Sequence, residues 1–292
     1  MRNRMIRLAT RSSAQARTQA EVVAQAITTA TGSDVELVFV ETLGDINKDQ
    51  PLHQIGGQGI FVKEVQQAVL RGDADIAVHS AKDLPSQSTD GLVVAAWCAR
   101  RDAGDALVGR SLDDLEHNAT VATGSVRRRA QLVAVRPDLN FIELRGNIQT
   151  RLDKIPASGS IVMAIAALEV LGLTDRITQR LPVGDFVPMV GQGCVAVECR
   201  DGDDAIHDAV RSIDHQSTRY ALEIERAFLA ELGAGCSMPV GAYVDEQGVL
   251  RTFMATGPNN TDRHVTFTEQ LPAREAQSFA REIARKSRSA LA

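Results

Sequence analysis

Short apolar runs alternate with stretches of helical spacing over the first part of the chain. The strands expected there are Ile6–Thr10, Val35–Thr42, Ala74–His79 and Leu92–Trp97. Apolar residues in Ala14–Ala30 recur at the spacing of one helix face, and a second helix is expected over Phe61–Leu70, before Gly72. This alternation predicts a parallel sheet covered by helices.

The same alternation follows in a second block. Its expected strands and helices are Val121–Thr123, Val126–Val135 (helix), Phe141–Leu144, Asn147–Lys154 (short helix) and Ile161–Ala164. Two such blocks predict two α/β domains with a cleft between them, which is the usual place for a ligand in such proteins.

The segment Met189–Cys199 indicates how the two blocks are connected. Gly191-Gln192-Gly193 forms a bend, and the apolar strand Cys194–Val197 and a helix over Asp204–Asp214 follow it. We interpret this segment as the return of the chain to the first block, which makes the first domain discontinuous.

The pattern changes after Ser217. The expected elements are a helix over Arg219–Leu232, strands over Gly241–Val244, Val249–Thr256 and His264–Glu269, and a helix over Ala273–Leu291. Strands followed by a helix predict a small α+β domain. The predicted domains are therefore residues 1–99 with 195–217, residues 100–194, and residues 218–292.

Composition narrows the class of protein. The chain has 292 residues, is 44% hydrophobic and 24% charged, and carries a net charge of −5, as is ordinary for a globular protein. This charge gives no attraction to nucleic acid or anionic membranes. No apolar run approaches the roughly 20 residues of a membrane span. No signal peptide is recognisable after the basic N-terminus, so we expect a cytoplasmic protein.

One candidate catalytic motif comes directly after an expected buried strand. Ala74–His79 leads into Ser80, Lys82 and Asp83, at the strand end where open α/β sheets present ligand groups. A carboxylate beside an ammonium is a candidate for proton transfer or for holding a developing cation. The alternative is a solvated Lys-Asp turn. His79 is interpreted as a core or near-site residue, because the six histidines show no metal-ligand spacing.

A strand–turn–helix junction lies at Thr123–Arg129. Backbone N–H groups at the start of a helix, the Ser125 hydroxyl and the adjacent guanidiniums favour an anion. Since neighbouring residues of a helix point about 100° apart, we expect that Arg127 and Arg128 cannot both grip one small group from a single face. They suit two carboxylates, or one carboxylate and a structural pair. A nucleic-acid patch is the alternative, against which the 4% aromatic content counts.

Arginine recurs at two further strand-to-helix turns. Arg145, Gly146 and Arg151 follow one strand, and Arg11 with Ser13 follows another. Each turn alone is typical of surface arginines, and arginine supplies 27 of the 32 basic residues, which is also explained by base composition. Three such turns together favour a polyanionic ligand, because guanidinium matches carboxylate bidentately.

The four cysteines form neither a disulfide framework nor a paired zinc motif. Cys98, Cys194 and Cys199 lie in apolar runs and are interpreted as core residues. Cys236 lies on a loop bounded by Gly and Pro, where it is either an exposed nucleophile or attachment point, or a buried structural residue.

Together these motifs closely resemble the porphobilinogen deaminase (hydroxymethylbilane synthase) family over essentially the whole chain. The matching runs are Leu8–Arg11, Gly44-Asp45, Gly56-Gly57 through Phe61–Glu64, Ala74–Ser80 with Lys82-Asp83, Gly124–Arg128, Leu144–Asn147, Val190–Gly193, and Gly235-Cys236 with Pro239 and Gly241. Their number, order and spacing make the resemblance highly specific. Gln54 and Gln58 depart from a pattern that often carries lysines in a glycine-rich loop, which lowers the positive charge there.

The resemblance implies three domains, of which the first two are similar to type II periplasmic binding proteins. It also implies a dipyrromethane cofactor joined to Cys236 by a thioether. On this primer the family condenses four porphobilinogen molecules head to tail with loss of ammonia, and water releases hydroxymethylbilane. No metal, nucleic acid or membrane partner is implied, and we expect a monomer.

Site roles follow from the resemblance residue by residue. It implies Asp83 as the principal catalytic group, which stabilises a cation and shuttles protons. The residues implied to hold the cofactor are Asp45, Ser80, Lys82, Thr123, Ser125, Arg127, Arg128, Arg145 and Gly146. The residues implied to bind substrate are Arg11, Ser13, Arg145, Arg151, Arg176 and Gln192.

The main alternative is a polycarboxylate-binding protein without enzymatic activity. It would share the two α/β domains and the arginine turns, but it would give no role to the last domain or to Cys236. A nucleic-acid-binding module is the more distant alternative.

Overall fold

The computed structural model describes residues 5–42, 59, 61–233, 238–259 and 262–292. Contacts divide the chain into two compact units. Unit 1 comprises residues 1–48, 55–101 and 194–220, and unit 2 comprises residues 49–54, 102–193 and 221–292. The predicted discontinuity of the first domain is therefore confirmed, while the exact boundaries of three domains stay a prediction.

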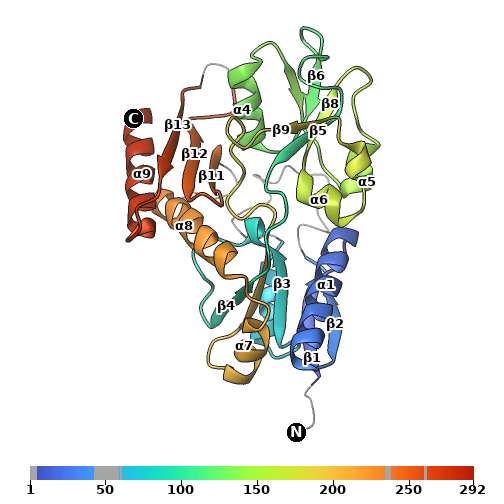
Figure 1. Cartoon of the computed structure of the whole chain (residues 1–292). Helices are drawn as coiled ribbons and strands as arrows, with labels where there is room; N and C mark the ends of the chain where they lie inside the picture. Colours follow the sequence, from blue (N-terminus) through green and yellow to red (C-terminus); the bar gives the residue numbers. More distant parts are fainter. Residues whose placement is uncertain (1–4, 43–58, 60, 234–237, 260–261) are drawn as a thin grey trace. The chain divides into compact units, whose positions relative to one another are not determined.

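The sheet of unit 1 has the strand order β2-β1-β3-β10-β4 (Figure 1). Its strands are β1 (Ile6–Arg11), β2 (Val35–Val40), β3 (Ile76–Ser80), β4 (Leu92–Trp97) and β10 (Val195–Arg200). β1, β2 and β3 run parallel, and β10 runs antiparallel between β3 and β4. β10 is the predicted return of the chain to the first block.

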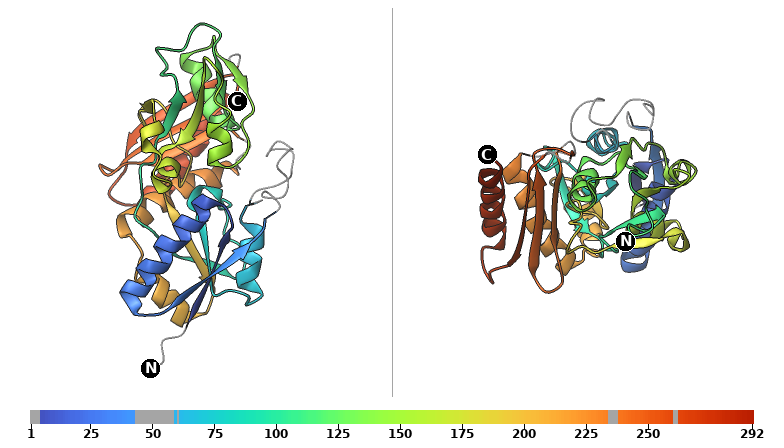
Figure 2. Two further views of the ribbon diagram at one scale, coloured as in Figure 1. Left: turned by 90° about the vertical axis from the view of Figure 1, so that its right-hand side faces the viewer. Right: turned by 90° about the horizontal axis from the view of Figure 1, so that it is seen from above.

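Helices cover both faces of this sheet. α1 (Ala14–Thr31) and α7 (Asp204–Arg211) pack on one face, and α3 (Lys63–Leu70) packs on the other. In the left view of Figure 2 the sheet separates α1, in blue, from α3, in cyan. α1 begins where the Ser13 hydroxyl accepts a hydrogen bond from Ala16 N, and it ends at Gly32 with φ of 70°. The covered faces explain the apolar strands of this block.

The α/β sheet of unit 2 has the order β7-β6-β8-β5-β9, with the same directions as the first sheet. Its strands are β5 (Asp105–Gly109), β6 (Thr120–Ala122), β7 (Asn140–Ile142), β8 (Ser160–Ala164) and β9 (Gln179–Leu181). α4 (Val126–Val135) packs on one face, and α5 (Ile148–Leu152) and α6 (Ile165–Val170) pack on the other. The predicted α/β class is confirmed for both blocks.

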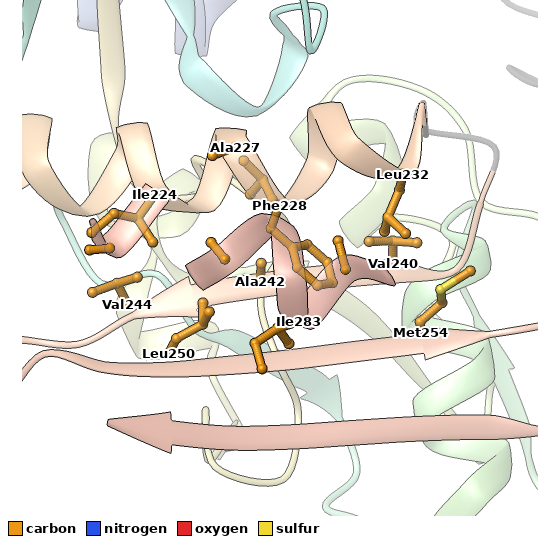
Figure 3. Close-up of a cluster of buried hydrophobic side chains, with 14 of the residues drawn as sticks. Ile224, Ala227, Phe228, Leu232, Val240, Ala242, Val244, Leu250, Met254 and Ile283 are labelled. Carbon is orange, nitrogen blue, oxygen red and sulfur yellow. The ribbon is translucent and has the colours of Figure 1, made fainter. Parts of the chain in front are cut away.

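The C-terminal layer of unit 2 is an antiparallel three-stranded sheet with two helices. Its elements are α8 (Gln216–Leu232, of which residues 221–232 belong to unit 2), β11 (Val240–Val244), β12 (Val249–Ala255), β13 (His264–Gln270) and α9 (Ala276–Leu291). Figure 3 shows Phe228 of α8 among apolar side chains of β11, β12 and α9, and its side chain is fully buried. The predicted α+β layer is confirmed, although the last helix begins at Ala276 rather than at Ala273.

The other face of this sheet packs on the α/β part of unit 2. Phe253 and Ala255 contact Ala130 of α4 and Val187. A Cβ at Gly241 would lie 2.7 Å from the carbonyl oxygen of Val187, so only glycine permits this approach. At Gly241 the three-stranded sheet and the α/β part of unit 2 are therefore in close contact. None of the helices in the described part of the chain is long and apolar enough to span a bilayer.

Candidate active site

Asp83 lies on a short helical turn at the carboxyl end of β3. The turn η1 (Ala81–Asp83) begins directly after Ser80, and it is fixed by Ala81 N donating to the carbonyl oxygen of Cys194 at 2.9 Å. The Asp83 side chain is half-buried, and no described residue donates a hydrogen bond to it or forms an ion pair with it. Its carboxylate is thus available for a ligand. Lys82 beside it is also half-buried.

A small hollow, which we call the β3 hollow, brings Asp83 together with other predicted residues of unit 1. Arg11, Gln19, Phe61, His79 and Ser80 line it beside Asp83. The Arg11 guanidinium lies over the Phe61 ring, 4.2 Å from its centroid, and Ser80 Oγ donates to Gln19 Oε1 at 3.1 Å. Arg11 and Ser80 meet because they end the parallel neighbours β1 and β3.

Three residues near the β3 hollow were not predicted as site residues. Glu198 of β10 lies on the same face of the sheet as His79, with 3.0 Å between His79 Nε2 and the carboxylate. Gln66 of α3 donates to both oxygens of Glu198, at 3.1 and 2.8 Å. Gln19 lines the hollow itself. The sequence offered one signal for Glu198. Like His79, it is a polar residue within an apolar strand.

In unit 2 two predicted turns lie side by side. Thr123-Gly124-Ser125 follows β6 and Arg145-Gly146 follows β7, which is the parallel neighbour of β6. A Cβ at Gly124 would lie 2.9 Å from the carbonyl oxygen of Leu144, so the two turns are in close contact. Gly146 has φ of 116°, a conformation that favours glycine. Ser125 caps α4 by accepting from Arg128 N at 3.4 Å.

Arg127 and Arg128 are buried and bind one carboxylate together. Arg127 Nη2 lies 2.7 Å from Asp105 Oδ2, and Arg128 Nη2 lies 2.7 Å from Asp105 Oδ1. The expectation that the pair would not grip one small group is wrong. The long side chains offset the different directions of their Cα–Cβ bonds, and each binds a different oxygen. Asp105, at the start of β5, was not predicted as a site residue, because neither β5 nor the partner strand β9 was predicted.

The charges of this cluster do not cancel. Burial raises the pKa of Asp105, but the charges and hydrogen bonds of the two arginines outweigh it, so the pKa lies below its ordinary value. Burial lowers the pKa of Arg127, and the attraction of Asp105 opposes this. With both arginines protonated, two guanidiniums and one carboxylate leave one net positive charge. No described residue accepts a hydrogen bond from the buried Nε of Arg127, which leaves this donor unsatisfied within the described part of the chain.

Gln192 belongs to the same cluster. Its Nε2 atom donates to Asp105 Oδ1 and to Ala103 O at 2.8 Å, and it lies 3.2 Å from Gly104 O. An amide has two N–H donors, so protein acceptors already occupy both. The structure therefore joins Gln192 to the arginine pair, in contact with Asp105.

The remaining predicted arginines are more exposed. Arg145 and Arg151 are half-buried near each other, and Arg151 Nε donates to Gly146 O at 2.8 Å. Arg176 is exposed on the turn η2 (Thr174–Arg176), with no described contact to the other site residues. Asp45 and Cys236 lie outside the described residues.

The other three cysteines lie in or near the core. Cys194 and Cys199 are buried and Cys98 is partly buried, which confirms their predicted place in the core. Burial raises the pKa of Cys98 and of Cys199 to about 11, with nearby acidic groups adding to the effect. These two thiols are therefore protonated at neutral pH.

Comparisons with known proteins agree on one family. The family model described as "Porphobilinogen deaminase, dipyromethane cofactor binding domain" matches residues 6–208, and "Porphobilinogen deaminase, C-terminal domain" matches residues 220–286. The chain is 46% identical to the porphobilinogen deaminase of Thermobifida fusca over 82% of this chain and 76% of that protein. It is 40% identical to the probable porphobilinogen deaminase of Methanopyrus kandleri over 95% of this chain and 97% of that one.

Similar solved structures include the methionine-binding protein MetQ. It is 16% identical to the chain, with a TM-score of 0.46 over 72% of this chain and 89% of MetQ.

Proposed function

Because the chain belongs to the porphobilinogen deaminase family, we propose that it condenses four porphobilinogen molecules head to tail and releases hydroxymethylbilane. The family is one of transferases that use a dipyrromethane cofactor. We place the attachment of this cofactor at Cys236, and we propose a monomeric, cytoplasmic protein. The observation that carries the proposal is the position of the Asp83 carboxylate, which no described residue binds, beside Arg11 and Ser80 in the β3 hollow.

The residues of unit 2 fit an acidic cofactor. When bound, dipyrromethane supplies the nucleophilic pyrrole carbon, and it carries acetate and propionate side chains. Arg127 and Arg128 retain one net positive charge after binding Asp105, and no described residue accepts from the buried Nε of Arg127. We assign this pair to an acidic side chain of the cofactor. Thr123 and Ser125 supply hydroxyls at the start of α4, and Arg145 and Gly146 lie at the adjoining turn.

Asp83 performs the proton transfers in this proposal. As ammonia leaves porphobilinogen, positive charge develops on the substrate, and a carboxylate close to the pyrrole nitrogen stabilises that charge. The same carboxylate can accept and return a proton. Arg11 and Ser13 at the start of α1 are assigned to the carboxylates of the substrate, together with Arg145, Arg151 and Arg176. Lys82 and Ser80 are assigned to the cofactor, as is Asp45.

Intact mass spectrometry tests the cofactor directly. The purified chain is expected to weigh more than its sequence by two porphobilinogen molecules less two ammonia molecules. The protein should also give a colour with an acidic aldehyde reagent for free pyrrole. A chain that keeps its unmodified mass after expression with porphobilinogen supplied, and that forms no hydroxymethylbilane, would support the non-enzymatic alternative instead.

Arg145→Lys tests the carboxylate contacts of the second turn. We expect enzyme–intermediate complexes of defined length to accumulate, because an ammonium keeps the charge but loses the bidentate geometry of guanidinium. Native mass spectrometry after a limited addition of porphobilinogen measures the distribution of complexes. Arg110→Lys is the matched control, since Arg110 is an exposed arginine of the same unit. A distribution equal to that of the parent in both variants would show that Arg145 does not hold the growing chain.

A further inference from the structure

Asp105 is the centre of a buried polar cluster in unit 2. Its side chain is 1% exposed, and it accepts hydrogen bonds from three side chains. Arg127 Nη2 donates to Oδ2 at 2.7 Å. Arg128 donates to Oδ1 from Nη2 at 2.7 Å and from Nε at 3.1 Å, and Gln192 Nε2 donates to Oδ1 at 2.8 Å. Four donors fix the direction of both carboxylate oxygens.

The segment that carries Gln192 is itself held by the C-terminal layer. Glu225 of α8 is fully buried, and its Oε2 accepts from Gly191 N at 3.0 Å. Its Oε1 accepts from Val244 N, at the end of β11, at 2.9 Å. One carboxylate thus ties the turn before Gln192 to both α8 and β11.

The other end of this segment holds Arg127 directly. Val187 O accepts from Arg127 Nη1 at 2.7 Å and from Gln131 Nε2 at 3.1 Å, and Val187 N donates to Gln131 Oε1 at 2.6 Å. The close approach of Gly241 of β11 fixes the backbone at Val187 and Pro188. Residues 187–192 therefore form a strap between the C-terminal layer and the arginine pair.

Charge and geometry give this cluster a role beyond stability. Two guanidiniums without Asp105 would carry two positive charges and would repel each other. With Asp105 ionised they keep one fixed arrangement and one net positive charge, which matches one carboxylate. Gln192 stabilises this arrangement by donating to Asp105, and both of its amide N–H donors are committed to protein acceptors.

We propose that Asp105 and Gln192 are positioning residues for chain elongation, which orient Arg127 and Arg128 and set the charge that the pair offers to an acidic side chain of the bound pyrrole chain. This inference rests on the proposed function and deepens it. In this inference Gln192 acts on the arginines through Asp105, and it does not contact the substrate. Glu225 and Gly241 of the C-terminal layer hold the strap, and the strap in turn holds the arginine pair.

Gln192→Met is the first test, because it removes the amide donor and keeps most of the side-chain volume. Misplaced binding groups cost up to about 100-fold in rate, and we expect kcat to fall at least about tenfold while the mass of the attached cofactor is unchanged. Shorter enzyme–intermediate complexes should accumulate. The matched control is Gln149→Met, since Gln149 is an exposed residue of α5 whose Nε2 donates to Asp153 Oδ1 at 3.0 Å. The control should retain the kinetics of the parent.

Asp105→Asn tests the charge separately. The arginine pair then carries two positive charges, so the acidic side chains of the covalently attached pyrrole chain should be held more tightly and its movement through the site should slow. We therefore expect kcat to fall with an unchanged or lower KM. Asp138→Asn is the control, because Asp138 also binds an arginine of unit 2, Arg136, through both oxygens. The inference would be overturned if Gln192→Met and Asp105→Asn both showed the kinetic constants and the enzyme–intermediate complexes of the parent.

A second measurement does not depend on turnover. Phenylglyoxal modifies accessible guanidiniums, and peptide mass spectrometry identifies which arginines react. Arg127 and Arg128 should react faster in Gln192→Met than in the parent, whereas Arg136 should react equally in both. Equal reactivity of the pair would contradict the inference even if Asp105→Asn did not fold. A parent chain without cofactor mass or turnover would instead contradict the proposed function, and the labelling result would still decide the positioning role.

Discussion

Asp83→Ala is expected to lower kcat by at least about 100-fold, which is the lower range of what one acid–base group contributes. The carboxylate lies in the β3 hollow with Arg11 and Ser80, and no described residue binds it. Alanine removes both the negative charge that stabilises the developing cation and the site that carries the proton. Since the side chain is half-buried and makes no described hydrogen bond, its removal should leave the fold intact.

The measurement is the rate of hydroxymethylbilane formation, with thermal unfolding and intact mass recorded on the same samples. Asp90→Ala is the matched control, because Asp90 is an exposed aspartate further along the same connection and lies outside the hollow. Asp83→Asn should be as inactive as Asp83→Ala, since an amide is of similar size but cannot ionise. Turnover near that of the parent in the Asp83 variants would refute the assigned role.

Cys236→Ser is expected to abolish stable attachment of the cofactor and with it nearly all turnover. A hydroxyl is a much weaker nucleophile than a thiolate, so the covalent link should not form. Cys98 and Cys199 do not replace it, because their raised pKa values keep them protonated at neutral pH. The variant should therefore have the mass of its unmodified sequence and should give no colour with the pyrrole reagent.

Cys98→Ser and Cys199→Ser serve as controls and should retain the cofactor. Each control changes a thiol of unit 1 that the structure places in or near the core. If Cys236→Ser still carried the additional mass, another sulfur atom would hold the cofactor. Peptide mapping of the modified chain would then identify that residue.

Local pattern was sufficient for most helices and strands. α1 and α4 begin at Ser13 and Ser125, whose hydroxyls accept from the first turn of each helix, and α1 ends at Gly32. The strand β3 begins with the apolar run Ile76–Val78 and β4 is apolar throughout, as is typical of strands covered on both faces. These signals lie within a few residues of the elements they define, so they could be found without the fold.

The strands β5 and β9 could not be found in this way. β9 is the short segment Gln179–Leu181, in which two polar residues precede one apolar residue, and it becomes a strand by pairing with β5, which is distant in sequence. Without β5 there was no reason to place Asp105 opposite the arginines. The expectation for Arg127 and Arg128 considered only the directions of neighbouring helix positions, so it missed that their long side chains reach the two oxygens of this carboxylate.

The amino-acid sequence by itself determined the α/β class, the discontinuous first block, the family, and the residue types that suit a polycarboxylate. Each of these depends on periodicity or on motifs of neighbouring residues. Only the tertiary structure decided which charges meet. It joined Asp105, Gln192 and the arginine pair, and it left the Asp83 carboxylate without a described partner. Ion pairing depends on distances across the sheet and between layers, and those distances arise from packing that no local pattern encodes.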